Sequence, residues 1–173
     1  MLRNRCTPTG TAAVAAATLL VGVLLAGCGG GSGPSKSQYV AKADAVCGST
    51  STQTTPLIRK VATSALALSA GGASAVARLA GAVGELYGVA SASLEKLRKL
   101  EQPSGAHAAI GRFLAPYATV VGAIGEAATS LGEGKVLRAL TLLEQVRSAS
   151  EQATSGARAY GLTRCETVLS ALA

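Results

Sequence analysis

The sequence predicts an all-α protein: an antiparallel helical bundle of about four helices, after a cleaved signal peptide and a flexible tether. Two observations carry this prediction. Apolar residues recur at three- and four-residue spacing through most of the chain, and no segment shows the strict alternation of a strand. Prolines and glycine pairs divide the chain into pieces of helix length joined by short loops, which is typical of antiparallel bundles.

The first helix is expected to begin at Ser37, with Val40, Ala43 and Cys47 on its inward face. Residues 49–55 are all Ser, Thr or Gln, whose side chains compete for the backbone and weaken a helix, and Pro56 follows. We therefore expect a kink or break there. A second helical piece over about 57–69 would end at the glycine pair that follows.

Residues 73–101 and 104–131 show the clearest helical repeats, with apolar positions seven residues apart and further ones beside them. Pro103 separates the two helices, and Ser104 is the expected cap of the second. Pro116 removes a backbone hydrogen bond, so we expect a kink near it. The residues expected to face the core are Val76, Leu79, Ala80, Val83, Leu86, Tyr87, Ala90, Leu94, Leu97, Leu100, Ile110, Phe113, Tyr117, Val120, Ile124, Ala127 and Leu131.

The last long helix is expected over about 135–160, ending at Gly161 because glycine readily adopts positive φ. A short final turn over 163–172 carries Cys165. The inward residues of the long helix are expected to be Val136, Ala139, Leu143, Val146, Ala153 and Tyr160.

Five glycines interrupt the two helices before it, and each weakens a helix by up to about 1 kcal/mol relative to alanine. They mark either tight helix crossings or loosely packed helices, which a fold held by a disulfide would tolerate. They are Gly81, Gly84, Gly88, Gly122 and Gly125.

The amino terminus has the order of a secretory signal: a basic start, an apolar run over 12–25 and two small residues. The run is shorter than the roughly 20 residues of a membrane span, and no later stretch is expected to span either. The segment Leu25-Ala26-Gly27-Cys28 resembles the lipobox of bacterial lipoproteins. The resemblance implies cleavage before Cys28 and a diacylglyceryl thioether on its sulfur. The alternatives are an ordinary secretion signal or an uncleaved anchor.

Three parts follow from this interpretation: a lipoprotein signal peptide over 1–27, a Gly/Ser-rich tether over 28–37, and a helical bundle domain over 38–173. Acyl chains on Cys28 would hold the protein at the extracytoplasmic face of the cell membrane, so membrane lipid is its first expected partner. The tether has an average reach of roughly 15–20 Å.

Without residues 1–27 the chain keeps 14 Lys and Arg against 9 Asp and Glu, a net charge of +5. Such a surface suits anionic headgroups or anionic envelope polymers, or serves solubility alone. Nucleic acid is not an expected partner, because an exported chain with one Phe, no Trp and no basic run lacks the usual features.

The four cysteines divide by position. Cys6 lies in the signal and Cys28 would carry the lipid, which leaves Cys47 and Cys165. Conditions outside the cytoplasm favour a disulfide between them. In the chain-entropy model, closing this long loop stabilises the fold by somewhat under about 5 kcal/mol. The alternatives are two free thiols or half of a metal site, for which no neighbouring Cys or His supplies further ligands.

Two short segments carry a second resemblance: residues 39–47 (YVAKADAVC) and residues 160–165 (YGLTRC). With the heptad helices between them, they resemble a set of lipoproteins of high-GC bacteria. These share an Ala-Asp-Ala-hydrophobic-Cys segment after the tether and a Gly-Leu-x-x-Cys segment at the end. The resemblance covers most of the mature chain and implies a helical bundle with a terminal disulfide. It implies no activity.

We expect no enzyme, and no catalytic, cofactor or metal site. His107 is the only histidine and has no acid beside it in sequence. The Glu-x-x-His pairs of a di-iron bundle are missing from the sequence. Asp44 is expected to be a surface or helix-capping residue.

Two functions from different classes remain. The first is a non-enzymatic binding or structural module of the cell envelope, which binds an envelope protein or another envelope component. The alternative is a carrier of an apolar small molecule between helices loosened by glycine and Pro116. An enclosed apolar cavity would favour the carrier. A filled core with one exposed apolar patch would favour the binding module.

Overall fold

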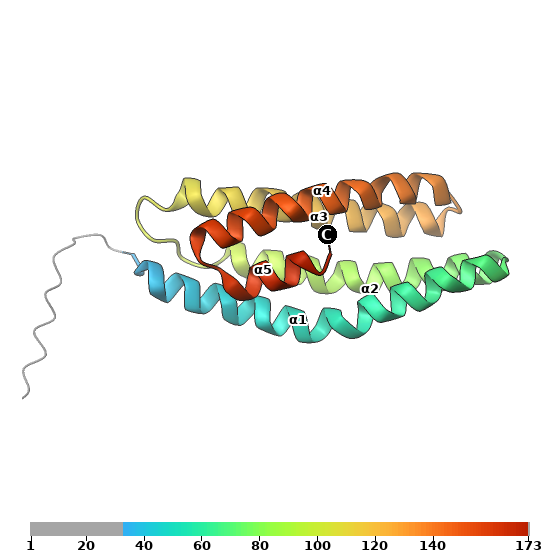
Figure 1. Ribbon diagram of the computed structural model, residues 1–173, viewed down its shortest axis with the longest axis horizontal. Coiled ribbons are helices and arrows are strands. Elements are labelled where there is room, and N and C mark those ends of the chain that lie inside the picture. The colour runs from blue at the N-terminus through green and yellow to red at the C-terminus, as the bar shows by residue number, and fades with distance from the viewer. Residues whose placement is uncertain (1–32, 173) are drawn as a thin grey trace, which may run out of the picture. The chain divides into compact units, whose positions relative to one another are not determined.

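The computed structural model describes residues 33–172, so the predicted signal peptide, Cys28 and most of the predicted tether lie outside the described residues. Within 33–172 the protein is all-helical, and four long helices pack antiparallel with one short helix at the C-terminal side (Figure 1). The predicted fold class is confirmed. The elements are α1 (Lys36–Leu66), the 3-10 helix η1 (Ala67–Ala70), α2 (Ala73–Arg98), α3 (His107–Gly132), α4 (Val136–Tyr160) and α5 (Thr163–Ser170).

The packing order places α5 in a gap between two long helices. The helix α3 packs against α2 and α4, and α1 packs against α2. No Cα of α1 lies within 8 Å of a Cα of α4 in the described residues, whereas α5 approaches both. Figure 1 shows α5 between them, near the start of α1 and the end of α4. We call the bundle end at Ser35 the tethered end, and the end at Gly71 and Gly134 the distal end.

The heptad residues of α2 and α3 form most of the core as predicted, and Ile110, Phe113 and Val120 are fully buried. Two predicted core residues lie on the surface instead: Tyr87 is 41% exposed and Leu143 is 50% exposed. In α4 the 3.6-residue period turns Leu142 inward in place of Leu143. The buried positions of α4 are Ala139, Leu142, Val146, Ala149, Ser150, Ala153, Gly156, Ala157 and Tyr160.

Of the two predicted alternatives, a kink or a break, the break is wrong, because α1 is one continuous helix of 31 residues. Its cap is Ser35 rather than Ser37: the Ser35 side chain accepts from the Gln38 amide, and Gln38 accepts from the Ser35 amide. Threonine hydroxyls of the polar stretch donate to carbonyls four residues earlier, as Thr50 does to Val46. These hydroxyls therefore find their hydrogen-bond acceptors within α1, and the helix stays intact. Figure 1 shows α1 bending rather than ending, which is a usual effect of an internal proline.

The third helix also differs from the prediction in detail. It begins at His107 with Ala106 at the cap position, and Ser104 does not cap it. It continues through Pro116 without interruption. By length and composition α3 would be able to cross a membrane, contrary to the expectation from the sequence. In this structure it packs between α2 and α4 and supplies the largest share of core side chains, so we interpret it as a core helix.

The expectation that the glycines of α2 and α3 mark tight crossings is wrong for four of the five. A Cβ built on Gly81, Gly84, Gly88 or Gly122 meets no atom within 4 Å, and only Gly125 lies against a neighbour, the ring of Tyr87. The tight crossing is at a glycine of α4. A Cβ on Gly156 would overlap the carbonyl of Arg112 and lie 2.9 Å from the Cα of Phe113, so α3 and α4 touch backbone to backbone there.

This contrast gives a matched pair of variants. Gly156→Ala is expected to lower the free energy of unfolding by about 2 kcal/mol or more, because the added methyl forces α3 and α4 apart. Gly81→Ala, at an open helical position, is expected to raise it by up to about 1 kcal/mol. Urea unfolding followed by far-UV circular dichroism measures both, and equal effects of the two variants would contradict the crossing.

Candidate functional site

The predicted disulfide is present and buried. Cys47 of α1 and Cys165 of α5 are bonded, with Cα atoms 4.9 Å apart, across a sequence separation of 118 residues. Cys165 is fully buried and Cys47 nearly so. The two alternatives, free thiols and half of a metal site, do not apply to bonded sulfurs. Because reagents do not reach these sulfurs, we assign the bond a structural role rather than a redox one.

Asp44 lies one turn before Cys47 and caps α5. Its carboxylate accepts hydrogen bonds from the backbone amides of Arg164 and Cys165, at 2.9 and 3.4 Å, and from the hydroxyl of Thr163 at 3.1 Å. The first turn of α5 has no side-chain cap of its own. The prediction of a helix-capping Asp44 is therefore confirmed, but the helix that it caps is distant in sequence. Carboxylate, disulfide and α5 form one junction.

An aromatic contact completes the tethered end. The rings of Tyr39 and Tyr160 meet edge to face with centroids 5.8 Å apart, and the Lys36 ammonium lies 4.8 Å from the centre of the Tyr160 ring. Burial, and to a lesser degree the neighbouring Tyr160, raises the pKa of Tyr39 to about 12. The Tyr39 hydroxyl is buried and has no hydrogen-bond partner among the described residues. This hydroxyl therefore destabilises the fold, while its ring stabilises it.

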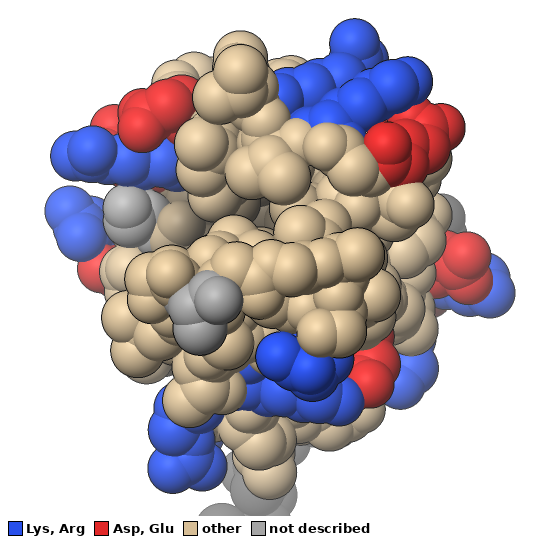
Figure 2. All heavy atoms as spheres, turned by 90° about the vertical axis from the view of Figure 1, so that its right-hand side faces the viewer, with Lys and Arg blue, Asp and Glu red and all other residues tan. Residues whose placement is uncertain are grey.

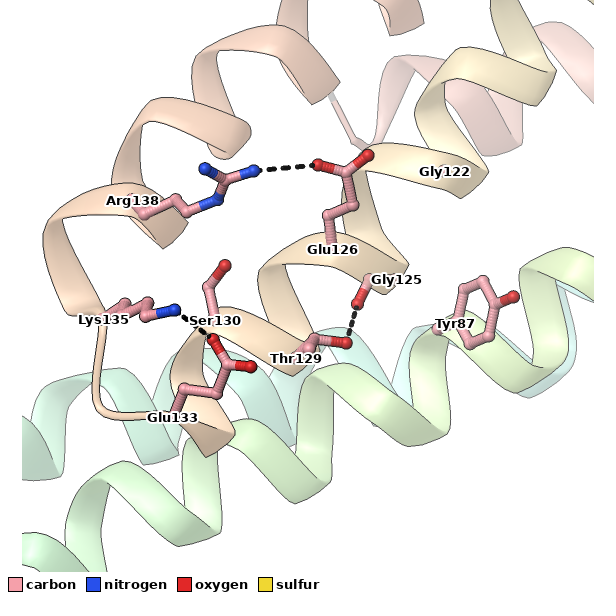
Figure 3. A pocket seen from close by; sticks show the side chains of 9 residues that line it. All are labelled: Tyr87, Gly122, Gly125, Glu126, Thr129, Ser130, Glu133, Lys135 and Arg138. Atoms are coloured by element: carbon pink, nitrogen blue, oxygen red, sulfur yellow. Dashed lines mark hydrogen bonds and ion pairs between the residues drawn. The ribbon is translucent and has the colours of Figure 1, made fainter.

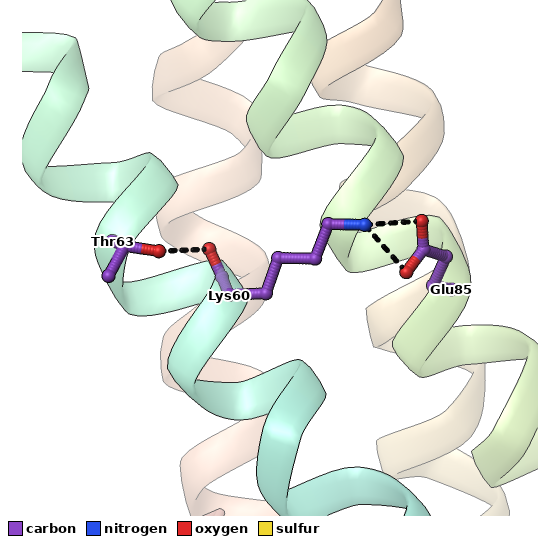
Figure 4. A network of polar contacts seen from close by, with 3 residues as sticks. All are labelled: Lys60, Thr63 and Glu85. Atoms are coloured by element: carbon purple, nitrogen blue, oxygen red, sulfur yellow. Dashed lines mark hydrogen bonds and ion pairs between the residues drawn. The ribbon is translucent and has the colours of Figure 1, made fainter.

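The positive charges are arranged differently at the two ends. At the distal end, Lys135 pairs with Glu133, Arg138 with Glu126, and Lys60 of α1 with Glu85 of α2 (Figure 4). Near the tethered end, seven exposed cations have no ion-pair partner within 4.0 Å among residues 33–172. They are Lys36, Lys42, Lys96, Arg98, Lys99, Arg112 and Arg164. Two further exposed cations without such a partner, Arg59 and Arg78, lie in the distal half, so the unpaired cations are more numerous near the tethered end.

A hollow of about 840 Å³, open to solvent, lies near the distal end (Figure 3). Its charged residues pair with each other, Lys135 with Glu133 at 2.7 Å and Arg138 with Glu126 at 3.7 Å. The ammonium of Lys135 holds the pKa of the exposed Glu133 carboxyl below its usual range. Tyr87 comes from the facing helix α2 and lies away from these pairs in the view. The Thr129 hydroxyl in this groove donates to the Gly125 carbonyl at 3.1 Å.

His107 is exposed at the first position of α3. The described residues include no cluster of three or more His, Cys, Asp or Glu side chains that would hold a metal. Among the described residues His107 is therefore not brought together with two acids. An enzymatic function would have required that arrangement.

The exposed large apolar residues gather in the distal half. Leu66 is 74% exposed at the end of α1, and Leu137 and Leu140 are 82% and 53% exposed in α4, beside Leu143. Figure 2 views this end and shows uncharged side chains across its middle, with charged side chains around the rim. Isolated exposed leucines need no explanation, but several on consecutive turns of one helix form an apolar patch of the kind that binds partners.

Sequence reasoning missed this patch. Leu137 and Leu140 were not among the expected core residues, and Leu143 was assigned to the core. A signal was present: residues 136–146 contain more large apolar side chains than one buried stripe of α4 accommodates.

Comparison of the chain with protein families, with curated proteins and with solved structures found no match. What the molecule does is therefore inferred from its own residues.

Removal of the Asp44 carboxylate that caps α5 should destabilise the fold. Asp44→Ala is expected to lower the free energy of unfolding by about 1–2 kcal/mol, because two amides and a hydroxyl lose their acceptor. Asp44→Asn keeps one acceptor oxygen and should lose less. Glu95→Ala, at an exposed acid of α2, serves as the control and should change stability little. Urea midpoints compare the variants, and an Asp44→Ala protein as stable as the wild type would refute the cap.

The raised pKa of Tyr39 predicts a pH dependence. An unfolded tyrosine ionises near pH 10 and the folded Tyr39 near 12, so the unfolded state loses its proton first as pH rises. This part of the stability is present below pH 10 and is lost as pH rises towards 12. Tyr39→Phe should therefore match or exceed the wild type in melting temperature at pH 7, and its melting temperature should fall less between pH 9 and 11.5, about the range of the transition. Parallel alkaline curves would contradict this assignment.

Proposed function

We propose that this protein is a lipid-anchored module on the extracytoplasmic face of the cell membrane that binds another envelope protein and catalyses no reaction. The anchor rests on the lipobox-like segment ending at Cys28, which lies outside the described residues. Two structural features support that location. The Cys47–Cys165 disulfide suits an oxidising compartment. The unpaired cations beside the tether suit the anionic surface of a bilayer.

The observation that carries the binding role is the apolar patch of α4 at Leu137, Leu140 and Leu143. It lies in the half of the bundle away from the tether, where a partner would reach it without obstruction from the membrane. Burying such side chains against another protein would remove apolar surface from water, which is the main favourable term in protein association.

The carrier alternative would need an enclosed apolar cavity. Five hollows over residues 33–172 are open to solvent; four have polar side chains in their lining, and the fifth is lined by Ala, Val, Leu and Gly. The core between the long helices is filled by packed side chains such as Phe113, Leu97 and Ile110. These features favour the binding module.

The anchor predicts a specific effect of one substitution. Cys28→Ala should leave the membrane fraction, or should accumulate as the uncut precursor, because only a thiol accepts the lipid. Cys6→Ala is the matched control: it removes a cysteine from the discarded segment and should keep the protein in the membrane. Cell fractionation and intact-mass spectrometry measure both. A wild-type protein that carries no acyl mass on Cys28 would rule out the anchor.

A further inference from the structure

The hollow of Figure 3 is a groove across α3, with Tyr87 of α2 on one side and Arg138 of α4 on the other. Two glycines of α3, Gly122 and Gly125, form part of its floor. A Cβ on Gly122 would meet no atom within 4 Å, and a Cβ on Gly125 would lie 2.8 Å from the Tyr87 ring. The missing side chains therefore leave room in the groove and let the Tyr87 ring lie against the α3 backbone.

One polar side chain of this groove is buried and has no partner. Ser130 is only 4% exposed and lines the groove, yet its hydroxyl has no hydrogen-bond partner among the described residues. Figure 3 shows this hydroxyl pointing from α3 towards Arg138. The neighbouring Thr129 hydroxyl, in contrast, donates to the Gly125 carbonyl. A buried hydroxyl without a partner destabilises a fold, so its place in an open groove points to a ligand that it would bind.

The groove also holds two acids and two cations, and only one of the two ion pairs is closed. Lys135 lies 2.7 Å from Glu133, whereas the Arg138 guanidinium lies 3.7 Å from the Glu126 carboxylate. A closed pair of this kind has a separation of about 2.7–2.9 Å. The Arg138 and Glu126 side chains are 66% and 62% exposed, and an ion pair with such exposure contributes little to stability. A ligand would therefore separate Arg138 from Glu126 at little cost.

The cationic side of the groove lies at the start of α4. The first turn of this helix has no side-chain cap and no acidic residue, so its free amides favour a negative group. Arg138 and the Ser130 hydroxyl supply further donors at the same side. These donors suit a carboxylate. Glu126, which faces Arg138, suits an ammonium.

We propose that this groove binds a free α-amino acid with an apolar side chain. Its carboxylate accepts hydrogen bonds from Ser130 and Arg138, and its ammonium pairs with Glu126. Its side chain lies over the glycine floor and contacts the Tyr87 ring, which is 41% exposed. A ligand with only one charge would leave either Arg138 or Glu126 without a partner, whereas an amino acid provides both charges on one carbon.

This inference goes beyond the proposed function. None of the exposed leucines of α4 lines the groove. A volume of about 840 Å³ is within the range of small-molecule sites. The groove and the leucine patch are thus separate surfaces, and each can be tested without the other.

Isothermal titration calorimetry of the full-length protein, purified in detergent, tests the inference. We expect l-phenylalanine and l-leucine to bind saturably, with dissociation constants below about 1 mM. Phenethylamine lacks the carboxylate and 3-phenylpropionate lacks the ammonium, so each should bind at least about tenfold more weakly than l-phenylalanine. O-phosphoethanolamine, which carries the charges of a lipid headgroup but no apolar side chain, should also bind at least about tenfold more weakly.

Three variants place the binding in the groove. Gly122→Leu fills the floor at an open helical position and should abolish binding while the protein stays folded. Gly81→Leu is the matched control, because it adds the same side chain at an open position of α2 outside the groove and should leave binding unchanged. Ser130→Ala should weaken binding about tenfold, because the carboxylate loses a donor. Circular dichroism checks that all three variants are folded.

Each contrary result overturns the inference. No binding of either amino acid would mean that the groove has no such ligand. Equal binding of 3-phenylpropionate or phenethylamine would make it a site for one charge only, and tighter binding of O-phosphoethanolamine would make it a headgroup site. Binding that persists in Gly122→Leu would place the ligand elsewhere on the molecule. None of these results would affect the proposed binding of an envelope protein through the leucine patch.

Discussion

The constraint on which the rest of this structure depends is the junction that holds α5 between α1 and α4. The backbones of these two long helices stay more than 8 Å apart at Cα, so the bundle is closed on that side through α5 and through the contact of Tyr39 with Tyr160. A helix of eight residues would be marginal by itself. It is held from α1 by the bond between Cys47 and Cys165 and by the carboxylate of Asp44 at its amino end. Covalent and polar contacts thus replace the long apolar interface that a full-length fifth helix would provide.

That junction gives the molecule two different ends. At the tethered end the gap is filled by α5, the disulfide is buried, and exposed cations gather. At the distal end the cations are mostly paired and leucines of α4 are exposed. An anchored protein whose two ends differ in this way would place its positive charge against the membrane and its apolar surface towards a partner.

The sequence predicted the fold class, the long helices and the disulfide, because heptad spacing and cysteine position are properties that local sequence expresses directly. It failed where tertiary context decides. Residues 49–55 look like a helix breaker, but their hydroxyls bond back to α1 and the helix continues. Gly156 is the one glycine in a backbone crossing, and nothing in its neighbouring residues distinguishes it from Gly84. The exposure of Leu140 was unpredictable for the same reason: its position on the helix can be derived from the sequence, but which neighbouring helices cover that side of α4 cannot.

Hydrogen–deuterium exchange on the intact and on the disulfide-reduced protein tests the central claim most directly. If α5 closes the bundle because it is bonded to α1, reduction should increase exchange in α5 and in the first half of α1, while α3 and its contact with Gly156 of α4 keep their protection. Equal exchange in the two forms, or a loss spread evenly over all helices, would contradict the claim that the junction holds α5 in the gap.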